Sequence, residues 1–186
     1  MKMIAVVYFS GSGHTAKLAS LLAGGVVDEP VSLIDVERIS DADWQQLDRA
    51  DVILFGAPTY MGSIAAGFKT FMDDSSDRWS DQVWADKLAG GFTVATYASG
   101  DKLTSLIQMS VFAAQHGMIW VGQNHLGPSA ADKADVNWQG AWLGLMATSS
   151  RDKDLMIDAG DSKTARLFGA RIEVAVKRWR IPAAQG

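Results

Sequence analysis

The stretch that decides the fold is Met3-Ile-Ala-Val-Val-Tyr-Phe9, followed at once by Ser10-Gly-Ser-Gly-His-Thr15 and then by Ala16-Lys-Leu-Ala-Ser-Leu-Leu-Ala23. The first segment is apolar and contains the β-branched and aromatic residues typical of a buried parallel strand. The last segment places its leucines on one face of a helix. A polar, glycine-containing loop between a strand and a helix directs backbone N–H groups toward the positive end of the helix dipole. This arrangement predicts an anion-binding site, most simply for a phosphate.

The alternation of strand and helix patterns continues along the chain. Further strands are predicted at residues 31–36, 51–57, 88–96 and 118–121, and further helices at 41–50, 64–72, 102–116 and 164–179. An alternating order of this kind predicts a parallel sheet with helices on both faces, joined by right-handed crossovers. No linker or repeat interrupts the order, so we expect one α/β domain spanning residues 1–186.

Two of the predicted helices carry specific signals. Ser40 precedes the helix at 41–50 and is a suitable N-cap residue. In the helix at 102–116, apolar residues recur with helical spacing, which predicts that they form its buried face. These residues are Leu103, Leu106, Ile107, Val111 and Ala114.

Residues 122–160 depart from this regularity. The segment is rich in Gly, Ala, Asp and Asn. A structureless loop of that length is uncommon in a compact domain and is usually functional or part of an interface. We therefore expect an excursion near the fifth strand, with some order of its own.

The composition narrows the class of protein. The chain has 186 residues and a net charge of −4, from 17 basic and 21 acidic residues, and it contains no cysteine. So mild a charge argues against nucleic acid or an anionic membrane surface as the main partner. The lack of cysteine excludes disulfides and thiolate metal sites, and we predict no metal site. No apolar stretch is long enough to span a bilayer, so we expect a cytoplasmic protein without membrane insertion.

Three polar loops follow predicted strands: residues 10–15, 58–63 and 97–101. In an open parallel sheet, ligands bind outside the carboxyl ends of the strands. We therefore expect the three loops to converge on one edge of the sheet and to form one binding site there.

The sequence of the first loop bears on which kind of phosphate compound binds there. It lacks the Gly-Lys-Ser/Thr of a Walker loop. Gly11-x-Gly13-x-x-Ala16 fits the relaxed dinucleotide fingerprint, and Asp35 stands where a ribose-binding acid belongs. The hydroxyl groups of residues 10, 12 and 15 instead favour a terminal phosphate ester, such as that of flavin mononucleotide (FMN), because a bridging pyrophosphate would use mainly backbone donors.

Several motifs in order along most of the chain carry a family resemblance. They are Ser10-x-x-Gly-His-Thr15, Gly56-Ala-Pro-Thr-Tyr-Met-Gly62, Phe68-Lys-Thr-Phe-Met-Asp73, Ala114-Gln-His-Gly-Met118, Gly160-Asp161 and Thr164-Ala-Arg-Leu-Phe-Gly169. Together they resemble the flavodoxin-like NAD(P)H:quinone oxidoreductases of the tryptophan-repressor-binding-protein (WrbA) type. The resemblance implies a flavodoxin-like three-layer sandwich, with a five-stranded parallel sheet in the order 2-1-3-4-5 and bound FMN.

The resemblance also implies a set of site residues. Those that match the phosphate loop are Ser10, Gly11, Ser12, Gly13, His14 and Thr15; those that match the loop along the flavin ring are Pro58, Thr59, Tyr60 and Met61; those that match the loop at the pyrimidine end and ribityl chain are Thr96, Tyr97, Ala98, Ser99, Gly100 and Asp101. His116 matches a histidine close to the working face of the flavin and is the candidate proton or hydrogen-bond donor to a quinone. Trp79 matches a tryptophan that lines the substrate pocket and reaches in from a neighbouring subunit.

The implied function is an FMN-dependent transfer of two electrons from NAD(P)H to quinones by a ping-pong mechanism. The expected partners are therefore a quinone, a nicotinamide cofactor and further copies of the chain, as a homodimer or homotetramer. Two alternatives remain open: a flavodoxin-type electron carrier, for which a net charge of −4 is modest, and an NADPH-dependent FMN reductase that releases its flavin.

Overall fold

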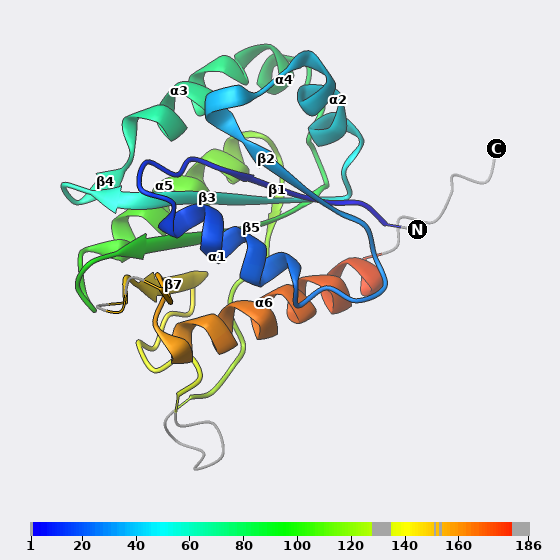
Figure 1. Cartoon of the computed structure of the whole chain (residues 1–186). Coiled ribbons are helices and arrows are strands. Elements are labelled where there is room, and N and C mark those ends of the chain that lie inside the picture. Colours follow the sequence, from blue (N-terminus) through cyan, green and yellow to red (C-terminus); the bar gives the residue numbers. More distant parts are fainter. Residues whose placement is uncertain (1, 128–134, 151, 153, 180–186) are drawn as a thin grey trace.

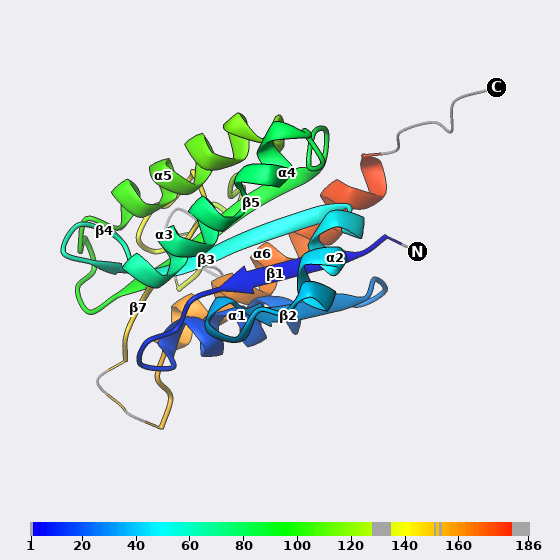
Figure 2. The ribbon, with the colours of Figure 1, turned by 90° about the horizontal axis from the view of Figure 1, so that it is seen from above.

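The computed structural model describes residues 2–127, 135–150, 152 and 154–179 of the chain. Its centre is a parallel sheet built from β1 (Ile4–Tyr8), β2 (Val31–Asp35), β3 (Val52–Tyr60) and β5 (Leu88–Ala95). These strands lie side by side in the order β2-β1-β3-β5, which can be followed from the labels in Figures 1 and 2. With β6 (Ile119–Trp120) beside β5, the order 2-1-3-4-5 implied by the family resemblance is confirmed.

The fifth position of the sheet is shared by two short strands, β6 (Ile119–Trp120) and β7 (Leu145–Thr148). β6 pairs in parallel with Leu88 and Ala89 at the start of β5, and β7 pairs in parallel with residues 92–95 at its end. The strand predicted at 118–121 is confirmed in the fifth position as β6, with two residues in place of four, whereas β7 was not predicted. The described residues 121–127 and 135–144 lie outside both strands, so the expected excursion begins between the two halves of the fifth position. Residues 128–134 of it lie outside the described part.

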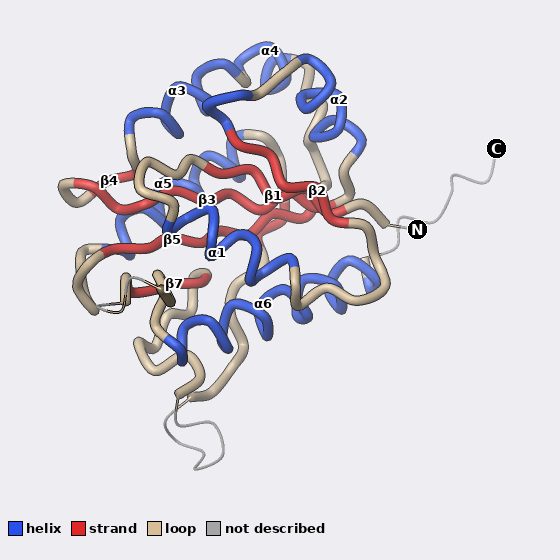
Figure 3. Tube along the Cα trace, in the orientation of Figure 1, coloured by secondary structure: helices blue, strands red, loops and turns tan. Residues whose placement is uncertain are grey.

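Helices cover both faces of the sheet. One face is covered by α1 (His14–Ala23) and α6 (Ala159–Arg178), and the other by α2 (Asp41–Arg49), α3 (Ala66–Asp74), α4 (Ser76–Ser80) and α5 (Lys102–Gln115), with a short 3₁₀ turn at Val36–Arg38. Figure 3 shows the strands as a layer between the helices. Successive side chains of a strand point to opposite faces. Ile4 and Val6 accordingly pack against α1 and α6, whereas Ala5 and Val7 pack against the other layer.

The local signals gave one correct and one wrong prediction. The Ser40 side chain accepts a hydrogen bond from the Asp43 N–H, and the Asp43 carboxylate accepts one in return from the Ser40 N–H, so the predicted N-cap is confirmed as a capping box. The predicted buried face of α5 is wrong. Leu103, Ile107 and Val111 are 52%, 45% and 54% exposed, and the buried face carries Lys102, Ser105, Leu106, Met109, Phe112 and Ala113.

The segment predicted as a loop at 58–63 forms a hairpin. β3 continues to Tyr60, and the two-residue β4 (Ser63–Ile64) pairs back onto it in antiparallel fashion. Met61 and Gly62 connect the two strands with φ values of 49° and 76°, the left-handed pair that a tight hairpin turn requires. Residue 64 therefore belongs to a strand, and α3 begins two residues later than predicted.

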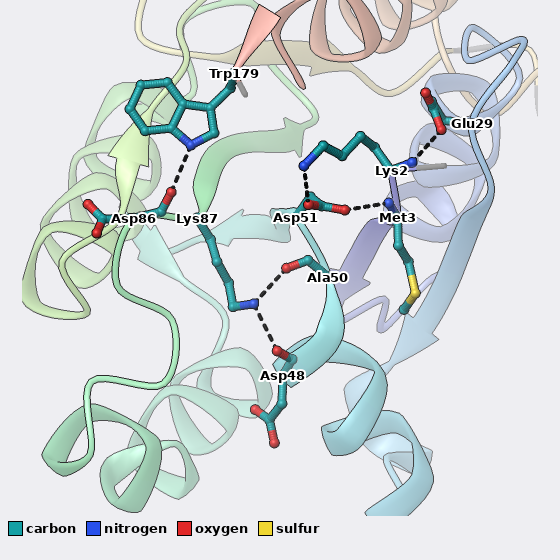
Figure 4. A network of polar contacts seen from close by, with 9 residues as sticks. All are labelled: Lys2, Met3, Glu29, Asp48, Ala50, Asp51, Asp86, Lys87 and Trp179. Carbon is teal, nitrogen blue, oxygen red and sulfur yellow. Dashed lines mark hydrogen bonds and ion pairs between the residues drawn. The ribbon is translucent and has the colours of Figure 1, made fainter. Parts of the chain in front are cut away.

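The amino edge of the sheet is closed by internal bonds (Figure 4). Lys87, directly before β5, donates from Nζ to the carbonyls of Asp48 and Ala50 at the end of α2. Asp51 accepts hydrogen bonds from the Lys2 ammonium and the Met3 N–H, each at 2.8 Å. A cation at the end of α2 also complements the negative end of the helix dipole. Of the helices in the described ranges, none is both long and apolar enough to cross a membrane.

The first prediction concerns the close contact of α1 with α6. A Cβ atom added to Gly169 would lie 2.0 Å from the Leu22 carbonyl oxygen, which belongs to the backbone and cannot move aside. Gly169→Ala should therefore lower the free energy of unfolding by about 1–3 kcal/mol, although alanine is the better helix former by about 1 kcal/mol. Urea unfolding measures this change. Gly24→Ala is the control, because the nearest atom to its added Cβ is at 3.4 Å; an equal loss in both variants would contradict the steric account.

Candidate functional site

A cavity of about 160 Å³ opens at the carboxyl edge of the sheet. It lies where β1, β3, β5 and β7 end, so the convergence of loops expected from the topology is observed for part of each loop. Its lining residues are Ser12, His14, Thr15, Pro58, Thr59, Tyr60, Val94, Ala95, Thr96 and Ser149. Seven of these are site residues predicted from the sequence, and Val94, Ala95 and Ser149 were missed.

Thr15 has the most unusual surroundings of the residues that line this cavity. Its side chain is 1% exposed, and the hydroxyl oxygen Oγ1 has no hydrogen-bond partner. Within the described chain, none of the backbone N–H groups of residues 11–15 donates a hydrogen bond to another residue. Buried polar groups are nearly always paired in native proteins, so the buried Thr15 hydroxyl stands out. The N–H groups of residues 11–14 belong to exposed or half-buried positions around it and are free to bind a ligand. A phosphate monoester would satisfy the hydroxyl and the N–H groups together.

The geometry of the first loop explains why these donors are free. Gly13 occupies the N-cap position of α1 with a φ of 85°, a conformation that favours glycine, and no side chain caps the helix there. The first turn of α1 also carries no acidic residue that would repel an anion. The Ser10 hydroxyl instead accepts a hydrogen bond of 2.9 Å from the Ala16 N–H, which holds the loop against the helix.

The second wall of the cavity comes from the end of β3. Thr59 is 8% exposed, and its Oγ1 lies 2.8 Å from both the Thr93 and the Ser105 hydroxyl oxygens, so its orientation is fixed by two elements behind it. Tyr60 is 46% exposed at the mouth. A Cβ atom added to Gly11 would lie 3.0 Å from the Tyr60 hydroxyl oxygen, so the 10–15 loop and the end of β3 lie close together here. Met61 lies at the tip of the hairpin and is fully exposed, outside the cavity lining.

The third wall comes from the end of β5, and only its first residues line the cavity. Thr96 does so, but residues 97–101 extend beyond it, and Tyr97 is 77% exposed. Asp101 ends the loop with a φ of 52° as the N-cap residue of α5. Ser149 completes the wall directly after β7. It could have been found only by reading the short apolar run before it as a strand of the sheet.

The structure does not bring His116 and Trp79 to this cavity. They line a separate hollow of about 330 Å³ together with Met72, Ser75 and Phe112, among others. His116 follows the last residue of α5, whereas the 97–101 loop precedes the first. A helix of 14 residues is about 21 Å long. Within one chain, the predicted donor to a quinone is therefore remote from the other predicted site residues.

The surroundings of His116 are aromatic and dry. The side chain is 1% exposed, its ring centroid lies 4.5 Å from that of Trp84 and 4.7 Å from that of Phe112, and Nε2 lies 3.1 Å from the Ser75 hydroxyl. Burial lowers the pKa of His116 from 6.5 to about 4. The imidazole is therefore neutral near pH 7, with Nδ1 left unpaired.

Comparisons with known proteins agree with this geometry. Residues 4–132 match the family described as NADPH-dependent FMN reductase. The chain is 44% identical over 175 residues to "Flavodoxin FldP" of Pseudomonas aeruginosa, covering 92% of this chain and 95% of that protein. It is 25% identical over 199 residues to an "NAD(P)H dehydrogenase (quinone)" of Chromohalobacter salexigens, covering 95% and 98%.

Solved structures support the same relationship. The fold is similar to that of a "flavodoxin, WrbA-like protein" from Agrobacterium tumefaciens, with a TM-score of 0.77, 36% sequence identity and coverage of 97% of this chain and 100% of that one. The resemblance to WrbA-type proteins inferred from the sequence motifs is confirmed, and so is the flavodoxin-like fold.

The second prediction follows from the depressed pKa of His116. In the unfolded chain this residue takes up a proton below about pH 6.5, but in the folded chain only near pH 4, so stability is lost as the pH falls through this window. At about 1.4 kcal/mol per pKa unit, the loss is about 2–3 kcal/mol. His116→Phe should remove this component, as measured by urea unfolding between pH 7.5 and pH 4. His125→Asn, which removes a histidine outside the aromatic cluster, serves as control; an unchanged acid dependence in His116→Phe would disprove the assignment.

Proposed function

Because this chain belongs to the NADPH-dependent FMN reductase family and has a flavodoxin-like fold, we propose that the cavity at the carboxyl edge holds FMN. The observation that carries the proposal is the set of unpaired donors: the buried Thr15 hydroxyl and the N–H groups of residues 11–15. In this proposal Ser10–Thr15 surround the phosphate, residues 58–61 lie along the ring, and residues 96–101 lie at its pyrimidine end. The mixture of polar loop and apolar strand ends suits a ligand with a charged tail and a flat ring.

We propose that the reaction is the transfer of two electrons from NAD(P)H to a quinone. Relatives named NAD(P)H dehydrogenase (quinone) match nearly the whole chain and support this choice. Bound FMN would supply the hydride chemistry. The protein contributes binding and orientation: Thr15 and the loop hold the anionic end, and the exposed rings of Tyr60 and Tyr97 offer faces on which a planar substrate can stack. We expect ping-pong order, in which the oxidised nicotinamide leaves before the quinone binds.

Trp79 and His116 enter the proposal only through a second copy of the chain. Their hollow is open, and Trp79 is 52% exposed in it. A homodimer or homotetramer that placed this hollow over the cavity of a neighbour would bring both residues to the substrate. Within one chain, we assign neither residue a step in the reaction.

A second candidate function is a flavodoxin-type electron carrier. The relative that is 44% identical bears the name flavodoxin, which favours this candidate. A carrier passes single electrons to partner proteins, so its flavin is reduced in two separable steps and NAD(P)H is not oxidised by quinones. A third candidate, suggested by the family description, is a reductase that releases FMN as product, and loss of the flavin during gel filtration would favour it.

The third prediction tests the phosphate site. Thr15→Val replaces an unpaired buried hydroxyl with a methyl group, so the apoprotein should keep its stability while FMN binds about 10–100-fold more weakly, as expected for one lost hydrogen bond to a charged group. Riboflavin, which lacks the phosphate, should bind equally to both proteins. Thr70→Val removes a hydroxyl that only bonds the Ala66 carbonyl on α3 and is the matched control. Equal weakening for riboflavin and FMN would refute a phosphate contact.

The fourth prediction tests the reaction. Protein reconstituted with FMN should oxidise NADH or NADPH in the presence of a quinone. Plots of reciprocal rate against reciprocal quinone concentration should be parallel at different nicotinamide concentrations, as ping-pong order requires. Intersecting lines would overturn the proposed order. An absence of quinone-dependent turnover, combined with reduction in two separate one-electron steps, would replace the enzyme with the electron carrier.

A further inference from the structure

A closed cluster of polar side chains lies behind the cavity wall. Its members come from segments far apart in the sequence: Lys102 at the start of α5, Gln139 in the insertion, Thr148 at the end of β7, and Asp161 in the first turn of α6. Lys102 is 0% exposed and Asp161 is 1% exposed. Charged side chains are almost never buried to this degree without a specific set of partners.

Hydrogen bonds join the four side chains in a ring. Lys102 donates from Nζ to the Gln139 Oε1 and, at 3.2 Å, to the Thr148 hydroxyl. Gln139 donates from Nε2 to the Asp161 carboxylate at 2.8 Å and to the Thr148 hydroxyl at 3.0 Å, and the Thr148 N–H donates to the same carboxylate oxygen at 2.7 Å. Gln139 and Thr148 thus stand between the two charged groups.

The ring adjoins two walls of the proposed FMN site. Lys102 directly follows the 97–101 loop, and its ammonium also donates to the Ala147 carbonyl at 3.0 Å. Thr148 directly precedes Ser149, which lines the cavity. The Lys102 ammonium is therefore fixed close behind the third wall, while Asp161 is held on α6 by the backbone of the same strand.

The Lys102 ammonium and the Asp161 carboxylate are both charged near pH 7. Burial lowers the pKa of Lys102 to about 8, and the Asp161 carboxylate opposes this effect. Burial raises the pKa of Asp161 to about 6, against the hydrogen bonds from Thr148 and Gln139 and the attraction of Lys102. A fold that needed only a mechanical tie here could use neutral side chains at lower desolvation cost.

We propose that Lys102 and Asp161 are positioning residues that set the reduction potential of the bound flavin, Lys102 raising it and Asp161 lowering it. The inference rests on the proposed function. Uptake of a hydride from NAD(P)H delivers two electrons and one proton to FMN, leaves NAD(P)⁺, and adds one negative charge to the flavin. A buried cation close to that charge favours the reduced form, a buried anion disfavours it, and the low dielectric behind the wall preserves both effects.

The fifth prediction uses two variants with opposite expected effects. Lys102→Met removes the cation, and Asp161→Asn removes the anion while keeping an oxygen acceptor for Thr148 and Gln139. The measured quantity is the ratio of the dissociation constants for reduced and oxidised FMN, obtained from anaerobic reduction of bound and free FMN. Lys102→Met should raise this ratio about tenfold and Asp161→Asn should lower it about tenfold, each equivalent to about 30 mV for a two-electron couple.

A matched control variant distinguishes an electrostatic effect on the flavin from a general loss of stability. Lys87 is a half-buried lysine that, like Lys102, donates to a backbone carbonyl, but it lies at the amino edge of the sheet (Figure 4). Lys87→Met should lower the free energy of unfolding and leave the ratio unchanged. A merely structural role for Lys102 and Asp161 would weaken the binding of both redox forms alike and leave the ratio unchanged in both variants.

The outcomes are distinguishable. If the wild-type protein binds no FMN, the proposed function itself fails. If it binds FMN but the two variants shift the ratio in the same direction, or not at all, only the present inference is overturned. If Lys102→Met does not fold, Asp161→Asn alone decides, since it preserves the hydrogen-bond acceptors: a lowered ratio supports the inference, and an unchanged or raised ratio refutes it.

Discussion

The rest of the site depends on one constraint, the unsatisfied donors where β1 turns into α1. Gly13 carries the chain into the helix with a φ of 85°, no side chain caps the first turn, and the Thr15 hydroxyl is buried without a partner. At the opposite edge of the sheet, the backbone groups are paired within the chain. Lys87 donates to the carbonyls at the end of α2, and Asp51 accepts a hydrogen bond from the Met3 N–H. The two edges of the sheet therefore differ: the polar groups at one are paired within the chain, and those at the other are free to bind the anion that we propose.

The sequence predicted those features that local patterns determine. The strand–loop–helix at the N-terminus and the Ser40 cap were correct because periodicity and capping chemistry act over short distances. The strand order is not a local feature, and it was predicted from the resemblance to the WrbA-type family. Predictions that required tertiary knowledge failed. Apolar spacing could not tell which face of α5 meets the sheet, and Ser149 could not be seen before the split fifth strand was placed. The helix predicted at 102–116 already separates His116 from the 97–101 loop, but His116 was assigned to the site by the family resemblance.

Burial has opposite consequences for the ionisable groups on the two sides of the molecule. His116 is enclosed by Trp84 and Phe112 and becomes neutral, so its environment removes a charge. Lys102 and Asp161 are equally hidden but stay charged, because each meets partners that fix its geometry. The difference follows from the hydrogen bonds: the Ala147 carbonyl and the Thr148 N–H hold the charged forms of Lys102 and Asp161, whereas aromatic rings surround His116.

The split of the fifth strand also bears on how a ligand could be exchanged. β7 is four residues long, lies at the edge of the sheet and pairs with β5. An edge element of that size opens locally at a lower free energy than the central strands, which separate only on global unfolding. Local opening of residues 145–148 would therefore displace the backbone next to Ser149, and amide hydrogen exchange at these residues would report how often the cavity wall opens.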